Sequence, residues 1–285
     1  TDVKMQVVRN DEGSPSSGSS AVAAMVGLGL GMVLYMFLMI YGAMVMQSVI
    51  EEKSSRVLEV VVSSVRPFEL MMGKIFGVAS VAVVQVLIWA VLVCGAGTAV
   101  MPHVLPDGAM EAAAALQQGG GAATAAAGDF DPETLGAIAL ATDVSYLAML
   151  FGYLLLFVVG GYLLYSAMFA AVGSAVDNAQ DAAQLQTPIM IPIILAVIVE
   201  MSVLNDPNSP LAFWFSLIPF TSPVVMMARI PYGIPTWEIV LSLVLLYAAF
   251  VGMVWLSAKI YRVGIFMYGK KPTLREMFRW IRYKY

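Results

Sequence analysis

Residues 51–59 read Glu-Glu-Lys-Ser-Ser-Arg-Val-Leu-Glu, and the chain continues through Arg66-Pro67 to Gly73-Lys74. This charged stretch, residues 51–74, lies between two apolar segments that are each long enough to cross a membrane. Its ionisable side chains are concentrated, whereas only 12% of the whole chain is charged. Charge at that density lies in water or against another protein, because burying it in hydrocarbon is costly. We therefore expect the chain to be organised around a hydrophilic connection between two membrane spans.

The composition indicates a membrane protein. Of the 285 residues, 60% are hydrophobic, and the mean hydropathy is +0.84, whereas soluble domains are about 45–50% apolar. Uncharged runs of near-spanning length predict an all-α polytopic fold with five transmembrane helices. A single cysteine, Cys94, and a single histidine, His103, exclude an internal disulfide and a two-histidine metal site, so no metal site is predicted. We expect the spans at residues 21–48, 75–100, 147–173, 188–204 and 237–258.

The segments outside the spans differ in composition. Residues 1–20 are polar and predict an extracytoplasmic linker. Residues 101–146 form an excursion with an Ala/Gly-rich centre and no Lys or Arg. Residues 205–235 contain six prolines yet are apolar, which predicts short re-entrant helices shielded by protein. Residues 259–285 hold eight of the fifteen Lys and Arg residues, and Thr273-Leu274-Arg275-Glu276 fits a capping box. This tail is expected to be a basic amphipathic helix on the membrane surface.

The distribution of Lys and Arg predicts the sidedness of the chain. Basic residues are frequent in the charged stretch and in the tail, and they are absent from residues 101–146. The positive-inside rule therefore places the charged stretch and the tail in the cytoplasm, and the excursion and the N-terminus outside. Residues 174–187 would also be inside, although they contain no basic residue. An outside N-terminus without a signal sequence predicts a missing upstream span, so we expect the chain to be a fragment of a longer protein.

The charged stretch has the pattern of an interfacial helix followed by a proline. Apolar residues recur at helical spacing from Val57 to Val65, and Lys53, Arg56 and Glu59 are spaced to share the opposite, hydrated face. Pro67 suits the first turn of the next helix. Two helices joined at a proline predict a rigid lever that receives force from a partner protein. The alternative is a solvated loop that only sets topology.

Two patterns stand out in the first span. Small residues recur every fourth position at Ala23, Gly27 and Gly31, which lets another helix approach closely. Methionines fall on one helical side and could line an adaptable apolar conduit, although ordinary packing or lipid contact is the favoured interpretation. These methionines are Met25, Met32, Met36, Met39 and Met46.

Two polar residues fall inside later spans. Gln85 lies in the middle of the second span, and we expect it to bond to a neighbouring helix. Glu200 lies near the outer end of the fourth span, and it is the one carboxylate that we place inside a span, apart from Glu238 at the edge of the fifth. An intramembrane carboxylate is a functional-site candidate, but a position so close to the boundary is equally consistent with a solvated group.

The charged stretch resembles the signature of ABC transporter type-2 permeases, and among them is most similar to the sodium-efflux, Nat-type permease subunits. The resemblance rests on residues 51–59, on Ser63-Ser64-Val65-Arg66-Pro67, and on Leu70, Gly73-Lys74 and Gly77. Ala171-Val172-Gly173-Ser174, Gln180-Asp181 with Gln184, and Ile218–Pro223 also resemble the family pattern.

The resemblance implies a fold, partners and site residues. It implies six spans with a large extracytoplasmic domain between the first two, in a multi-pass protein of the bacterial cytoplasmic (inner) membrane, and a homodimer paired with ATP-binding subunits. It also implies that the charged stretch is the coupling helix that docks on the ATPase. The implied coupling residues are Glu51, Glu52, Lys53, Arg56, Glu59, Arg66 and Pro67, and the implied extracellular re-entrant segment includes Pro219, Phe220, Thr221 and Pro223.

The chain lacks a phosphate-binding loop of its own. Its Gly73-Lys74 has Phe68 where the loop needs a glycine and is followed by Ile75. ATP-Mg is therefore expected on a partner ATPase, with no cofactor bound by this chain and no enzymatic or nucleic-acid-binding role. We predict the membrane subunit of an ATP-driven exporter, with Na⁺, a drug, a peptide or a lipid-linked molecule as cargo. The alternatives are an ion-driven secondary transporter or channel and an intramembrane enzyme, for which the sequence holds no recognised motif.

Overall fold

The computed structural model describes residues 17–55, 65–100, 103, 105, 108–117, 132–267 and 273–280. Within these residues the chain is helical and has no strands, and five helices are long and apolar enough to cross a membrane, so the predicted fold class is confirmed. The long helices are α1 (Ser17–Ser54), α3 (Pro67–Ala99), α8 (Val144–Ala175), α9 (Ala179–Val203) and α12 (Thr236–Gly264). The shorter elements are α5 (Ala109–Gln117), α7 (Pro132–Thr142), α10 (Pro210–Leu217), α11 (Ser222–Arg229), η1 (Ile230–Tyr232) and α13 (Leu274–Trp280).

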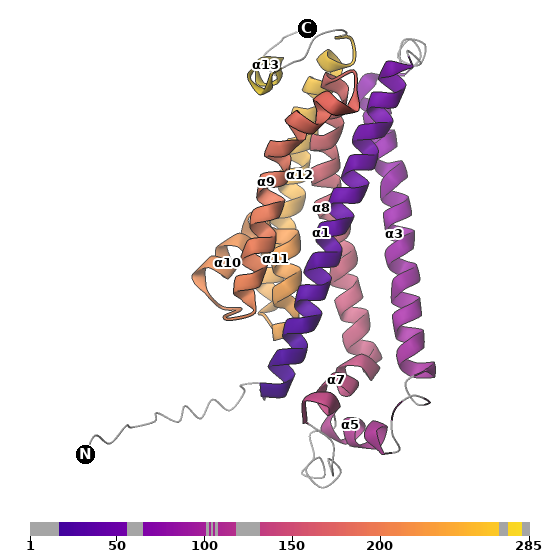
Figure 1. Ribbon diagram of the computed structural model, residues 1–285, viewed down its shortest axis with the longest axis vertical. Coiled ribbons are helices and arrows are strands. Elements are labelled where there is room, and N and C mark those ends of the chain that lie inside the picture. Colours follow the sequence, from indigo (N-terminus) through magenta and orange to yellow (C-terminus); the bar gives the residue numbers. More distant parts are fainter. Residues whose placement is uncertain are drawn as a thin grey trace, which may run out of the picture.

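The five long helices run side by side along the long axis of the molecule (Figure 1). Helix α8 is central, because it packs against α1, α3, α9, α11 and α12. The ends of α1 and α12, the starts of α3 and α9, and helix α13 all lie at one end of the bundle, which we call the basic end (Figure 1). Helices α5 and α7 lie at the opposite end.

Two helices differ in length from the sequence prediction. Helix α1 continues without a break to Ser54, beyond the predicted end of the first span at residue 48, and so includes the start of the charged stretch. Helix α9 begins at Ala179 rather than at residue 188, and it contains Pro188 and Pro192 in its interior. Prolines are tolerated inside membrane helices, because neighbouring groups compensate for the lost backbone hydrogen bonds. They therefore did not mark a helix start here.

Local signals account for several helix ends. Asp143 caps α8 by accepting from the backbone N–H groups of Ser145 and Tyr146, and Asn178 caps α9 by accepting from that of Asp181. Helix α3 has Pro67 in its first turn, as predicted. The predicted capping box of the tail is present, since the Thr273 N–H donates to Glu276 Oε2 at 2.9 Å and the Glu276 N–H to the Thr273 hydroxyl at 3.4 Å.

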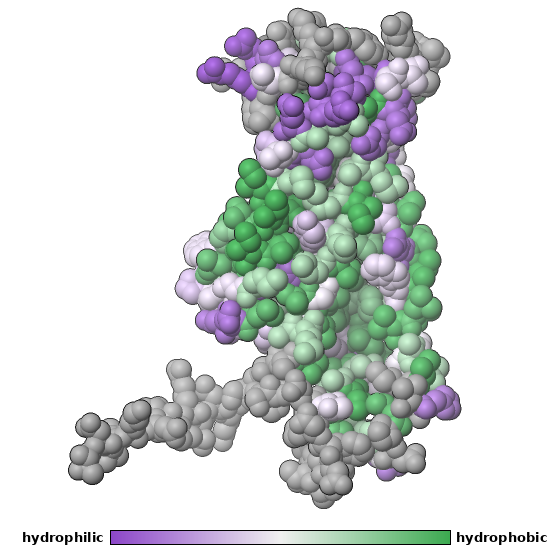
Figure 2. Space-filling model, viewed as in Figure 1, coloured by the Kyte–Doolittle hydropathy of each residue, from purple (hydrophilic) through white to green (hydrophobic). Residues whose placement is uncertain are grey.

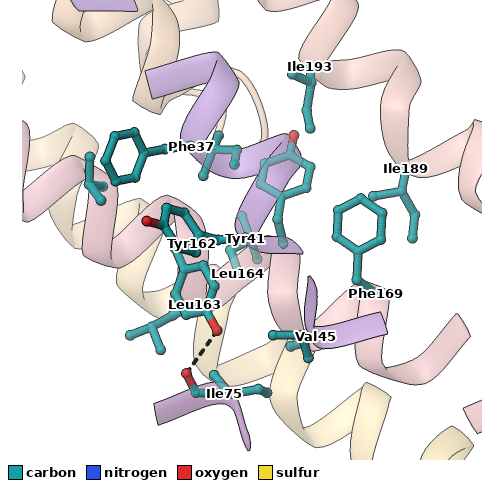
Figure 3. Close-up of a cluster of buried hydrophobic side chains, with 14 of the residues drawn as sticks. Phe37, Tyr41, Val45, Ile75, Tyr162, Leu163, Leu164, Phe169, Ile189 and Ile193 are labelled. Carbon is teal, nitrogen blue, oxygen red and sulfur yellow. Dashed lines mark hydrogen bonds between the residues drawn. The ribbon is translucent and has the colours of Figure 1, made fainter. Parts of the chain in front are cut away.

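The core lies between α1 and α8 (Figure 3). Phe37, Tyr41 and Val45 of α1 face aromatic and aliphatic side chains of α8, and the Tyr162 hydroxyl donates to the Ile75 carbonyl of α3 at 2.9 Å. Apolar residues also cover the flanks of the bundle, whereas hydrophilic residues gather at the basic end (Figure 2). An apolar flank next to a hydrophilic end is a surface suited to a bilayer.

Candidate functional site

The most connected polar group at the basic end is Lys53, the last basic residue of α1. Its side chain is 0% exposed. The ammonium donates to the Ser174 carbonyl of α8 at 2.8 Å and to the Gly264 carbonyl of α12 at 2.9 Å, and it pairs with Asp177 Oδ1 at 3.1 Å. Carbonyls in the last turn of a helix are electron-rich and favour a cation. Lys53 therefore joins the ends of three helices.

A second lysine joins α3 to the same region. Lys74 Nζ donates to the Ser48 carbonyl at 2.9 Å and to the Ser48 hydroxyl at 3.1 Å, and it pairs with Glu52 Oε2 at 2.7 Å. We call Lys53, Lys74, Glu52 and Asp177 the lysine cluster. It links α1, α3, α8 and α12 at the point where α1 ends. It also explains the lack of a basic residue in residues 174–187: the connection between α8 and α9 places Asp177 beside a lysine from α1.

The lysine cluster changes part of the predicted coupling surface. The prediction that Lys53 lies on a hydrated face is wrong, because its three donor hydrogens are directed to acceptors inside the bundle. Glu52 is half-buried against Lys74, whereas Glu51 and Arg66 are exposed. Arg56 and Glu59 lie outside the described residues.

A groove beside Arg66 adds to the exposed surface at the basic end. Its volume is about 560 Å³, and it lies between the start of α3 and the end of α12. Pro67 and the exposed ring of Phe68 line it from α3. Arg262 and the exposed ring of Phe266 line it from the other side. Aromatic rings next to arginines are the composition that protein contacts favour.

Helices α11 and α9 pack closely against the small-residue face of α1. A methyl group at Gly27 would overlap the Ala228 carbonyl oxygen of α11, and one at Gly31 would overlap Glu200 Oε1 of α9. Ala23, one turn further out, is buried. Close approach along this face agrees with the predicted small-residue pattern.

Glu200 lies deeper than its place in the sequence predicted. Its side chain is 1% exposed, and neither carboxyl oxygen has a hydrogen-bond partner among the described residues. Gly31, which it contacts, is nine residues from Val22, where the first apolar span begins. Nine residues of helix correspond to about 13 Å, so the carboxyl group meets α1 about 13 Å beyond the start of that apolar segment, and protein encloses it there. The alternative of a solvated group at the boundary does not hold in this conformation.

The other predicted residues of α1 and α3 have distinct surroundings. Met32 and Met36 are exposed, the latter at 59%, and Met39 is half-buried. Met39 packs against the hydrophobic core, so the predicted methionine stripe is only partly open. Gln85 accepts a hydrogen bond from the Tyr41 hydroxyl of α1. This is the interhelical bond that the sequence led us to expect of Gln85.

The proline-rich segment folds into α10, α11 and η1, and every residue of α11 is buried. The Tyr165 hydroxyl of α8 donates to the Phe220 carbonyl at 2.5 Å, and the Thr221 hydroxyl donates to the Phe215 carbonyl at 2.6 Å. Pro223 packs against Gly161 of α8, where an added methyl group would be 3.0 Å from the Pro223 ring. Protein therefore shields this segment on several sides. Its re-entrant placement in the membrane stays a prediction.

An ion pair that the sequence analysis did not anticipate fixes the end of this segment. Arg229 of α11 lies 3.0 Å from Glu238 of α12, and both side chains are buried. The guanidinium also donates to the Pro207 carbonyl at 2.8 Å and to the Ser216 hydroxyl at 2.6 Å. The prolines on either side gave no sign of this pair.

An apolar groove of about 590 Å³ lies at the end of the bundle opposite the lysine cluster. Val26 of α1, Val93 of α3 and Leu150 of α8 are among its lining residues. The described residues that line it are apolar apart from Tyr146, whose hydroxyl is buried and has no hydrogen-bond partner among the described residues. The groove can accommodate an apolar chain, but it offers no set of oxygens for a bare cation.

Comparison with known proteins places this architecture in a family. Residues 3–259 match the family described as "ABC-2 family transporter protein". Over 246 residues the chain is 27% identical to the uncharacterized protein YhaP of Bacillus subtilis (strain 168), a match that covers 86% of this chain and 52% of YhaP. It is also 27% identical over 260 residues to the uncharacterized protein MJ1024 of Methanocaldococcus jannaschii, covering 90% of this chain and 54% of MJ1024.

The chain thus spans about half the length of these curated relatives. No solved structure matches it. The family match nevertheless extends from residue 3 to residue 259 and so includes four of the five long apolar helices in full and most of α12. The chain belongs to the ABC-2 family of transporter proteins.

Proposed function

We propose that the chain is the membrane subunit of an ATP-driven exporter, in which a separate ATPase binds ATP-Mg and pushes on the charged stretch. The observation that supports this most is the lysine cluster. It connects the end of α1, which is the start of the charged stretch, to α3, α8 and α12. Force applied there would reach four of the five long helices through short polar contacts.

The proposed ATPase contact consists of the exposed groups at the basic end. Glu51 and Arg66 are exposed, and the groove between Phe68 and Phe266 lies beside Arg66. Arg56 and Glu59 complete the contact by resemblance alone. Lys53 is excluded from it, because its role is to hold the helices together. A second copy of the subunit is part of the same proposal, with the exposed side of α1 and α3 available for pairing.

The apolar groove beside Val26 and Val93 favours an apolar or amphiphilic cargo. Its lining resembles the surface of a lipid-tail site more than a cation site, since Na⁺ is held by several oxygen ligands. Na⁺ efflux is the cargo that the resemblance to Nat-type permeases suggests, and it is the less favoured of the two. An ion-driven transporter without an ATPase is the second candidate function, and buried Glu200 is the observation that supports it.

The test is co-purification with the ATPase encoded beside the full-length gene. Glu51→Lys with Arg66→Glu is expected to lower the amount of bound ATPase at least several-fold, because both substitutions reverse exposed charges of the proposed contact. The matched control is Glu111→Lys, which reverses an exposed charge at the opposite end of the bundle. Unchanged ATPase binding by the double variant, or full transport without any ATPase, would contradict the proposal.

A further inference from the structure

Glu200 is a carboxyl group enclosed by protein inside the membrane domain. It comes from α9 and lies against the bare backbone of Gly31 in α1. Its side chain is 1% exposed, and among the described residues no donor or cation contacts its oxygens. Neither the exporter proposal nor the lysine cluster uses this group.

The helices packed against α9 supply no charge for Glu200. These helices are α1, α8, α10 and α11. Helices α8 and α10 contain no Asp, Glu, Lys or Arg, the charged residues of α1 lie at the basic end, and Arg229 of α11 is paired with Glu238.

The other titratable groups near α9 are tyrosines and the charged residues of the basic end. The hydroxyls of Tyr162 and Tyr165 in α8 donate to backbone carbonyls, and Tyr35 is half-buried one turn from Gly31. At the basic end, α1 carries Glu51, Glu52 and Lys53, and α9 carries Asp181.

An ionised carboxylate is therefore unfavourable at this position. Removing such a group from water without a partner costs several kcal/mol even after relaxation, and a neutral carboxyl group avoids most of that cost. A bound metal cation would need several oxygen ligands. The described residues contain no group of three or more His, Cys, Asp or Glu side chains that could provide them. The occupant that fits Glu200 is a proton.

We propose that Glu200 is a proton-binding site of the membrane domain, occupied while α1 packs against α9 and emptied into water when the two helices separate. Because residue 31 has no side chain, the backbone of α1 covers the carboxyl group directly. Separation of the helices would admit water, and the carboxyl group would release its proton there. Renewed packing would require uptake of a proton from water. This proposal goes beyond the exporter function and holds whether or not an ATPase drives the separation.

The first experiment uses dicyclohexylcarbodiimide, an apolar reagent that modifies protonated carboxyl groups in apolar surroundings. The full-length protein in lipid vesicles is treated at a series of pH values, and the labelled peptides are quantified by mass spectrometry. Label is expected on Glu200, decreasing as pH rises, and absent from Glu200→Gln. Glu238 is the internal control, because it is also buried but is paired with Arg229 and should stay unlabelled. Protection of Glu200 by Na⁺ at fixed pH would overturn the proposal in favour of a metal-cation site.

The second experiment does not depend on access of the reagent. Unfolding in mixed micelles is compared for the wild type and Glu200→Gln at several pH values. The packed wild type holds a proton that the unfolded chain releases, so higher pH favours its unfolding, and Gln carries no such proton. The unfolding constant of the wild type is expected to rise relative to that of Glu200→Gln by up to about tenfold per pH unit. Equal pH dependence of the two proteins would overturn the proposal, whatever the labelling shows.

Discussion

The contact between Gly31 and Glu200 can be tested by adding one methyl group. In Gly31→Ala the new methyl carbon would overlap Glu200 Oε1 and lie 2.7 Å from its carboxyl carbon and 3.2 Å from Oε2. Ordinary contacts of this kind are about 3.4 Å or longer, so the carboxyl group must move. Because Glu200 is enclosed on all sides, the displacement strains its surroundings.

The expected magnitude follows from two opposing terms. Overpacking in a well-packed interior costs about 1–3 kcal/mol, and replacing glycine by alanine within a helix returns up to about 1 kcal/mol. We expect Gly31→Ala to lower the free energy of unfolding by up to about 2 kcal/mol. Gly29→Ala is the matched control, because a methyl group there meets nothing within 4 Å. It should be neutral or slightly stabilising.

A double-mutant cycle isolates the contact. Glu200→Ala removes the carboxyl group that the new methyl group strikes, so Gly31→Ala should cost little in that background. The coupling free energy is expected to be about 1–3 kcal/mol, within the range for residues in contact. Gly27→Ala serves as the second control, because its methyl group would strike the backbone of Ala228, which Glu200→Ala does not relieve.

The assay is reversible unfolding of the full-length protein in mixed micelles, with the free energy of unfolding extrapolated to zero denaturant. The reasoning is refuted if the cost of Gly31→Ala is the same with and without Glu200. It is also refuted if Gly29→Ala costs as much as Gly31→Ala, since the effect would then belong to the helix and not to the contact.

Two further predictions concern the polar contacts between helices. Asp177→Asn should lower the free energy of unfolding by about 2–3 kcal/mol. This is less than the 3–5 kcal/mol lost when a fully buried pair loses one partner, because the Asp177 side chain is 31% exposed. Glu111→Gln is the control, and an equal effect of the two substitutions would contradict the role of the lysine cluster. Tyr41→Phe should lower the free energy of unfolding by about 0.6–1.7 kcal/mol, because it removes the hydrogen bond to Gln85. Gln85→Leu should then lower it little further in the Tyr41→Phe background. Additive losses would show that the two side chains do not act as a pair.

The sequence predicted best what depends on local pattern. Apolar length predicted the five long helices, and the spacing of small residues predicted the close face of α1 at Gly27 and Gly31. Gln85 was expected to bond across helices, because a lone amide in hydrocarbon needs a partner. Each of these inferences required only the residue and its neighbours within one helix.

Sequence-based predictions were wrong where the partner of a side chain is distant in the sequence or is a backbone atom. Lys53 shows a pattern suited to a hydrated face, yet its acceptors are carbonyls of residues 174 and 264. No side-chain pattern encodes an available carbonyl, so its burial was not predictable. Glu200 was placed near the boundary because its distance from the end of α9 was counted along the chain. Its depth is set instead by the point at which α9 meets α1.

The lysine cluster and Glu200 together suggest how the end of α1 and its Gly31 contact are related. Lys53 is held at the basic end by three acceptors, whereas Gly31 meets Glu200 through direct packing alone. The two residues are 22 positions apart on one helix, so a tilt of about 5° at Lys53 displaces Gly31 by about 3 Å. That is roughly the diameter of a water molecule. A small movement produced at the charged stretch would thus be sufficient to hydrate Glu200, and the proton on this carboxyl group would in turn favour the packed position of α1.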